Sequence, residues 1–210
     1  MKRFFRITLV LLLVLSVVLI SGCGKKESNT VEISYTLGKG VWTVSVPKNE
    51  DGTPKYTFTT TKPEGMSVYK SFYLETDNAK LGFASSGLTY NTSVKYKEKY
   101  GETKASFDGY LEFIEDKDLF NKNYLPGLQQ FEINGRKALS YYNRVGGSGS
   151  YKYYGFFYLI GADDVYPGSR AEMVVNYKDT ENLPTESKEL DEETKTIINS
   201  LKITPVAEQK

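Results

Sequence analysis

Residues 128–145 read LQQFEI, NG and RKALSYYNRV, and they decide the fold more clearly than any other stretch of the chain. Asn134-Gly135 lies between two strand-like runs. Both residue types tolerate the positive φ angles of a type I′ turn, whose twist matches that of the strands it joins. The stretch therefore predicts a tight antiparallel hairpin. The run GGSGS at 146–150 follows it as a flexible loop.

Strand-like runs continue on both sides of this hairpin. After it, residues 151–160 carry apolar side chains at both odd and even positions. This pattern is typical of a strand covered on both faces. The run at 42–47 ends at Pro47, and this favours an outer strand because proline cannot donate a ladder hydrogen bond. The remaining predicted strands occupy residues 31–35, 56–60, 68–76, 80–85 and 171–177, with 203–206 as a short edge.

Two helices are predicted from apolar residues at helical spacing. The first covers residues 107–116, with Ser106 placed as its N-cap. The second lies near the C-terminus, where the apolar stripe comprises Leu190, Thr194, Ile197, Ile198 and Leu201. Residues 88–104 fit either a strand or a solvated helix. Together these patterns predict the α+β class, an antiparallel β-sheet with helices packed on it.

The N-terminus has the pattern of an export signal. Lys2, Arg3 and Arg6 precede an apolar run at 7–20, and small residues follow it. This run is short compared with the about 20 apolar residues that a spanning helix needs, so a retained membrane helix is the less favoured alternative.

The motif Ile20-Ser21-Gly22-Cys23 resembles the lipobox of bacterial lipoproteins. In that class the cysteine is joined to diacylglycerol and a peptidase then cuts before it, here after Gly22. Cys23 is the only cysteine, so an internal disulfide cannot form. We therefore predict an exported lipoprotein, held on the outer face of the cell membrane by acyl chains such as palmitate on Cys23.

The expected organisation is a signal peptide at 1–22, a polar tether at 23–31, one α+β domain at 32–206 and a short tail at 207–210. The precursor has 27 basic and 26 acidic residues. Removal of the three basic residues of the signal leaves 24 against 26 acidic, a net charge of −2. This near-neutral balance argues against nucleic acid as a partner.

Histidine is absent from the chain. That absence excludes Ser-His-Asp triads, Cys-His dyads and metal sites that depend on imidazole. Because Cys23 is committed to lipid, thiol catalysis and iron–sulfur clusters are excluded as well. We predict no catalytic residue, no metal site and no cofactor.

Two acidic clusters are interpreted as structural. Residues 115–118 with Asn121 lack the glycine and the terminal glutamate of an EF-hand loop, and they favour an acidic helix end. Asp163-Asp164 favours a turn between strands rather than a metal site.

Tyr142, Tyr151 and Tyr153 are the candidate ligand-binding residues, because they flank the 146–150 loop. Tyrosine combines an apolar body with a polar tip and is enriched at interfaces. The alternative is that most aromatic side chains in this region form core. Lys95, Lys97 and Lys99 form a basic row that suits either a solvated face or contact with anionic lipid, and we favour the solvated face.

Four features resemble the PsbP-like family, which includes bacterial lipoproteins. They are the WTVSVP strand at 42–47, the hairpin with NGRKA at 134–138, the tyrosine-rich strand at 151–160 and the closing IINSLK at 197–202. The resemblance covers roughly residues 31–204. It implies an α/β/α-like sandwich around an antiparallel sheet, and a role in binding or assembly rather than catalysis. No residue here matches a metal site of the photosynthetic members.

Two functions from different classes are consistent with these observations. The favoured one is a non-catalytic, lipid-anchored binding or assembly module of the cell envelope that recognises an envelope protein or a small ligand. The alternative is a carboxylate-dependent envelope or sugar hydrolase, in which paired carboxylates act on a sugar stacked on tyrosine.

Overall fold

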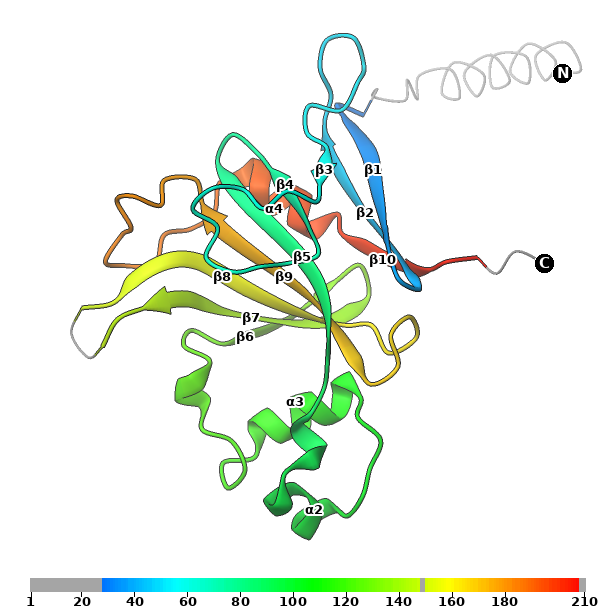
Figure 1. Ribbon diagram of the computed structural model, residues 1–210, viewed down its shortest axis with the longest axis vertical. Coiled ribbons are helices and arrows are strands. Elements are labelled where there is room, and N and C mark those ends of the chain that lie inside the picture. The colour runs from blue at the N-terminus through cyan, green and yellow to red at the C-terminus, as the bar shows by residue number, and fades with distance from the viewer. Residues whose placement is uncertain (1–27, 148–149, 208–210) are drawn as a thin grey trace, which may run out of the picture.

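A computed structural model describes residues 28–147 and 150–207 of the chain. It has the α+β architecture that the sequence predicts, with antiparallel sheets and helices packed on them (Figure 1). Ile20, Ser21, Gly22 and Cys23 lie outside the described residues, so the predicted signal peptide and lipid site stay predictions. Within the described residues, no helix is long and apolar enough to cross a membrane.

The larger sheet has seven strands in the order β3-β4-β5-β9-β8-β7-β6, all antiparallel. The predicted hairpin forms its last two strands, and Asn134 and Gly135 have φ angles of 47° and 76° in the turn. The strands are β3 (Phe58–Thr59), β4 (Phe72–Glu75), β5 (Ala79–Gly87), β6 (Gln129–Ile133), β7 (Arg136–Val145), β8 (Lys152–Gly161) and β9 (Ser169–Tyr177).

A second sheet has three strands in the order β1-β2-β10. Its strands are β1 (Thr30–Leu37), β2 (Gly40–Pro47) and β10 (Lys202–Pro205). The expectation of an outer strand at 42–47 is wrong, because β2 is the central strand of this sheet. Pro47 is tolerated there because β10 pairs only with residues 40–43 and leaves the proline end of β2 free on that side.

Helices lie on both faces of the seven-stranded sheet. Successive residues of a strand point to opposite faces. Leu139 and Leu159 accordingly pack with α3 (Phe107–Glu115), whereas Ala138 and Ile160 pack with α4 (Glu192–Asn199) and with Trp42 of the small sheet. The expected α/β/α-like layering therefore includes the small sheet on the α4 side.

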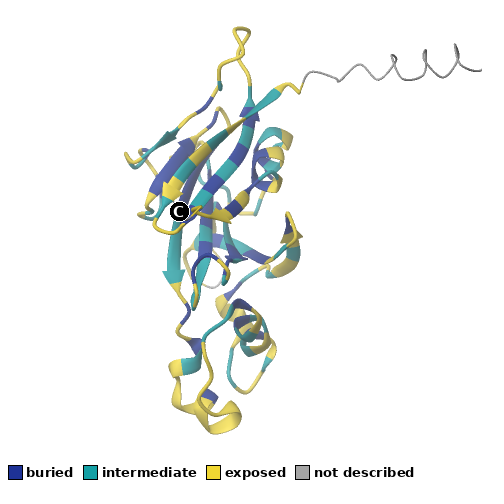
Figure 2. Ribbon diagram, turned by 90° about the vertical axis from the view of Figure 1, so that its right-hand side faces the viewer, coloured by how far each residue is buried: buried dark blue, intermediate teal, exposed yellow. Residues whose placement is uncertain are grey.

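The helix predicted at 107–116 is confirmed as α3, and Ser106 Oγ accepts a hydrogen bond from Gly109 N at 3.1 Å. The ambiguous residues 88–104 form the 3₁₀ helix η1 (Tyr90–Thr92) and α2 (Val94–Tyr100), not a strand. The tyrosines of α2 face the core only at Tyr96. Figure 2 shows how exposed α2 is at the end of the molecule opposite the start of β1.

Several predicted boundaries need correction. The strand predicted at 56–60 covers only Phe58–Thr59. The strand predicted at 68–76 begins only at Phe72, because Lys70 N donates to Tyr73 Oη at 2.6 Å instead of joining a ladder. The tether predicted at 23–31 is too long by at least two residues, because Thr30 and Val31 already belong to β1 and pair with Pro47 and Val46.

Candidate functional site

The candidate site is an open cavity of about 430 Å³ on the α4 side of the seven-stranded sheet. We call it the groove. Strands β6, β7 and β8 form its floor, and the chain segment that leads into α4, drawn in orange in Figure 1, forms its wall. The floor residues are Gln129, Ser140, Tyr142, Phe156 and Tyr158. A smaller recess of about 180 Å³ shares several of these residues and extends toward Asn199.

Strand register explains the aromatic floor. Tyr142 pairs with Phe156, and Ser140 pairs with Tyr158, so these side chains emerge on one face. The ring centroids of Tyr142 and Phe156 lie 5.8 Å apart, and Tyr158 packs edge-on against Phe131 at 6.0 Å. All four rings are half-buried. The expectation that residues 151–160 are covered on both faces is therefore met only in part, because α4 leaves this patch uncovered.

The wall of the groove is held in place by polar contacts. Tyr177 Oη donates to Lys188 O at 2.7 Å and accepts from Lys188 N at 2.8 Å. Lys195 of α4 pairs with Glu189 at 3.1 Å and with Glu192 at 3.0 Å. Hydrogen bonds to Glu192 and Glu189 raise the pKa of Lys195, so its charge is retained at neutral pH.

The groove presents hydrogen-bond donors that stay protonated. Burial, with a smaller contribution from Tyr177, raises the pKa of Tyr158 to about 12. Its hydroxyl is therefore neutral under ordinary conditions and can donate. Gln129 and Ser140 add neutral polar groups beside it. The arrangement suits a ligand with both polar groups and an apolar face.

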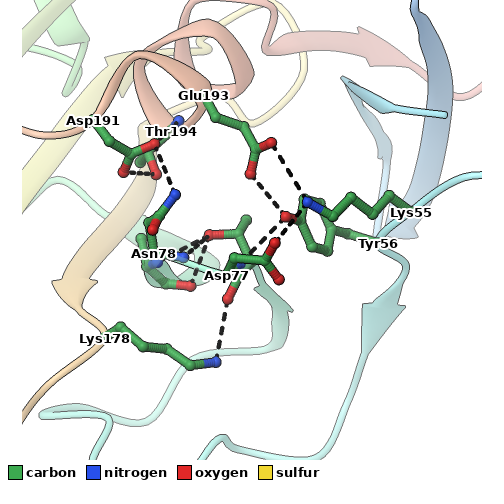
Figure 3. Close-up of polar contacts among 10 residues, drawn as sticks. Lys55, Tyr56, Asp77, Asn78, Lys178, Asp191, Glu193 and Thr194 are labelled. Atoms are coloured by element: carbon green, nitrogen blue, oxygen red, sulfur yellow. Dashed lines mark hydrogen bonds and ion pairs between the residues drawn. The ribbon is translucent and has the colours of Figure 1, made fainter. Parts of the chain in front are cut away.

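A polar network fixes the start of α4 (Figure 3). Asp191 is the N-cap and accepts from Thr194 N at 2.9 Å and from Asn78 Nδ2 at 3.4 Å. Tyr56 Oη donates to Glu193 at 2.7 Å. These bonds tie the helix to the turn between β4 and β5 and to the loop before β3, so the position of the groove wall is set by the whole fold.

Carboxylates gather in a neighbouring recess of about 250 Å³ lined by Asp179, Glu189 and Asp191. Hydrogen bonds from Asn182 lower the pKa of Asp179. Burial acts to raise the pKa of Asp191, but hydrogen bonds from Thr194 outweigh it and hold the pKa below its usual value. Both groups are thus ionised at neutral pH, whereas the general acid of a glycoside hydrolase needs a raised pKa.

The structure separates the three tyrosines predicted from sequence. Tyr142 lies in the groove, and Tyr153 packs edge-on against it with centroids 5.4 Å apart. Tyr151 lies elsewhere, with its ring 3.7 Å from the guanidinium carbon of Arg144. Sequence reasoning missed Gln129, Lys188 and Lys195, because no local pattern predicts a groove whose floor and wall come from distant segments.

The other clusters singled out in the sequence have structural partners. Asp164 pairs with Arg136 at 2.6 Å, and Asp163 accepts from Phe107 N at 2.8 Å. Asp116 terminates α3 and pairs with Lys99. Among residues 28–147 and 150–207, no group of three or more His, Cys, Asp or Glu side chains is placed to hold a metal ion.

The lysines at 95, 97 and 99 do not form a row, since successive odd positions diverge around a helix. Lys97 pairs with Glu102 at 3.2 Å and Lys99 with Asp116 at 2.6 Å.

The fold and the groove define an α+β protein with a ligand-sized cavity on an incompletely covered sheet face. No protein-family model matches this chain, and no curated protein matches it.

Proposed function

We propose that this chain is a lipid-anchored, non-catalytic binding module of the cell envelope, which recognises an envelope protein or a small ligand in the groove. The observation that carries the proposal is the groove itself, whose volume of about 430 Å³ falls in the range of ligand sites. The lipobox at 20–23 and the resemblance to the PsbP-like family support the envelope location and the binding role.

The chemistry of the groove favours a polar ligand with an apolar face. Tyr142, Phe156 and Tyr158 offer ring surface, while Tyr158 Oη, Gln129 and Ser140 offer hydrogen bonds. Lys188 adds a positive charge that pairs with no carboxylate within the part of the chain that the structure describes. A ligand bearing a negative group is therefore favoured over a neutral one.

Site-specific photocrosslinking in intact envelopes tests the groove. A benzophenone amino acid replaces Gln129, which is exposed at the groove floor, or Glu98, which is exposed on α2 far from the groove. We expect an adduct, seen by mass spectrometry, from position 129 only. Identical adducts from both positions, or none from position 129, would contradict the groove as the binding site.

The substitution Tyr158→Phe, combined with the crosslinker at position 129, tests whether the Tyr158 hydroxyl takes part in ligand binding. It keeps the ring and removes only the hydroxyl, so the fold is retained and a donor is lost. We expect a weaker adduct at position 129 in this variant. Retention of the full yield would show that the hydroxyl plays no part in recognition.

The anchor has its own test. Cys23→Ala removes the thiol that accepts lipid, so lipid labelling is expected to vanish and the protein to be released or to stall in processing. Continued labelling and membrane attachment of the variant would refute the lipobox interpretation.

A further inference from the structure

A separate recess of about 300 Å³ lies where the segment after η2 (Lys122–Tyr124) meets the ends of β7 and β8. We call it the Arg144 recess, and its lining includes Asn123, Tyr124, Asn143, Arg144 and Tyr151. Among the residues that the structure describes, Tyr142 alone lines both this recess and the groove.

Arg144 differs from the other two arginines that the structure describes. Arg136 donates to both carboxylate oxygens of Asp164, at 2.6 and 2.7 Å, and Arg170 pairs with Glu172 at 2.9 Å. Arg144 is half-buried, yet no described carboxylate lies within ion-pair distance of it. A half-buried guanidinium with unpaired donors is a ready partner for an anion.

The guanidinium of Arg144 is also held in a defined orientation. Its central carbon lies 3.7 Å from the ring centroid of Tyr151. Stacking of this kind covers one face of the planar group and leaves the N–H groups at its edge free to bind a carboxylate with two parallel hydrogen bonds.

Asn143 is fixed beside Arg144 by a β-bulge and by hydrogen bonds. The strand register shifts between these two residues, and bulges of this kind redirect side chains next to sites. Asn143 Nδ2 donates to Ser67 Oγ at 2.8 Å and to Asn176 Oδ1 at 3.1 Å. Both amide hydrogens are thereby engaged, so the carbonyl oxygen of this buried residue is its available acceptor.

The lining defines the class of ligand. One cation matches a single negative charge, whereas a phosphate dianion would keep an unmatched charge. Tyr124 is 74% exposed and offers an open ring face. Asn123 and Asn143 offer neutral partners for hydroxyl groups. A ring that carries one carboxylate and several hydroxyls satisfies all three features.

We propose that the Arg144 recess binds an acidic sugar. The sugar carboxylate pairs with the guanidinium of Arg144, the ring lies against Tyr124, and the hydroxyls bond to Asn123 and Asn143. This proposal is independent of the groove, because it uses other residues and stands whether or not the groove has a ligand.

Titration calorimetry on the full chain in detergent tests the proposal, with glucuronate as the probe. Glucose lacks the carboxylate, benzoate lacks the hydroxyls, and inorganic phosphate presents the anion without a ring. We expect glucuronate to bind and the other three to bind at least about tenfold more weakly, since each of them lacks a group that the recess would bind.

Amino-acid substitutions test whether glucuronate binds in the Arg144 recess. Arg144→Gln is expected to reduce glucuronate affinity at least about tenfold. Lys152→Gln removes an exposed cation from the same hairpin and is expected to leave the affinity unchanged. Tyr124→Ala truncates an exposed ring without a folding cost, so its expected loss of affinity tests the recess even if the arginine variant fails to fold. Absence of glucuronate binding, equal binding of any other probe, or unchanged affinity in Arg144→Gln and Tyr124→Ala overturns the proposal.

Discussion

Tyr166 joins two layers of the fold through one hydroxyl group. Trp42 Nε1 donates to Tyr166 Oη at 2.9 Å, and Tyr166 Oη donates to Leu37 O at 2.6 Å. Trp42 is fully buried in the core between the two sheets. The backbone of Gly40 passes so close to the Tyr166 hydroxyl that a Cβ there would collide with it.

The first prediction is that Tyr166→Phe destabilises the protein by about 1–3 kcal/mol, because the buried indole N–H loses its acceptor. Urea unfolding followed by tryptophan fluorescence measures the change, since Trp42 is the only tryptophan. Tyr69→Phe is the matched control, because Tyr69 is 83% exposed and its variant should unfold like the parent. Equal stability of all three proteins would contradict the prediction.

Asp116 stabilises the fold through contacts that depend on pH. Lys99 Nζ lies 2.6 Å from Asp116 Oδ2, and Tyr100 Oη donates to the same atom at 2.8 Å. The hydrogen bond from Lys99 and then that from Tyr100 lower the pKa of Asp116 to about 2. These contacts link α2 to the end of α3.

The second prediction follows from the direction of that shift. A carboxylate whose folded pKa lies below its unfolded value of about 4 stabilises the fold fully above that value, and the effect is lost as pH falls through about 2. Asp116→Asn should therefore lower the unfolding midpoint at neutral pH, and this difference should shrink toward zero as pH falls through about 2. Asp118→Asn, 3.8 Å from the same lysine and 89% exposed, should change little at either pH. A midpoint difference that persists at low pH would be inconsistent with this account.

At the scale of elements, the turn of the central hairpin does more than connect two strands. Asn134 Nδ2 donates to Asn199 O at 3.0 Å and to Leu201 O at 2.8 Å. These carbonyls are at and just after the C-terminal end of α4, where no later turn of the helix supplies donors. The turn therefore caps the helix that borders the groove.

The third prediction separates these two roles of Asn134. Asn134→Gly keeps the positive φ and removes both hydrogen bonds, with an expected loss of about 1–2 kcal/mol in the free energy of unfolding. Asn134→Asp keeps the side-chain size but has no donor, so it should lose at least as much. Full stability of both variants in denaturant titrations would rule out the capping role.

Sequence patterns predicted those helices and strands that are determined by residues close together in the chain. The hairpin follows from Asn134-Gly135, and α3 follows from Ser106 and its apolar spacing. Residues 88–104 were ambiguous because tyrosines at even positions fit both periods. Only the packing of Tyr96 and the N-cap bond from Tyr96 N to Ser93 Oγ, at 3.2 Å, favour the helix.

The groove could not be predicted from short stretches of sequence. Its floor comes from β6, β7 and β8, and its wall comes from the segment before α4, which lies far from them in the chain. Tyr142 was found because tyrosine is itself suggestive, whereas Gln129 carries no such signal. The central place of β2 was missed because no local pattern shows that the short strand predicted at 203–206 pairs with residues 40–43.

At the scale of the whole molecule, the start of β1 and the helical end lie far apart. In Figures 1 and 2, β1 begins at one end and α2 lies at the other. Cys23 precedes Ser28 by five residues, which span at most about 18 Å when extended. A lipid on Cys23 would therefore hold the β1 end near the membrane and point α2 away from it.

The fourth prediction tests this orientation in lipid vesicles. Fluorophores are attached through Glu50→Cys, in the turn after β2, or Glu98→Cys, on α2, both of which replace exposed glutamates. A quencher on the lipid headgroups should dim the label at position 50 more than the label at position 98. The reverse order would mean that the domain lies the other way round.

The pairing of β10 with β2 also has a consequence for biosynthesis. Ile203 lies opposite Trp42, so the last strand completes the sheet that the first residues of the domain began. If the proposed export signal directs the chain through a channel N-terminus first, β2 cannot pair with β10 until residues near 205 have emerged. A chain cut short before β10 would lack the strand that lies beside Trp42, so the small sheet would stay incomplete on that side.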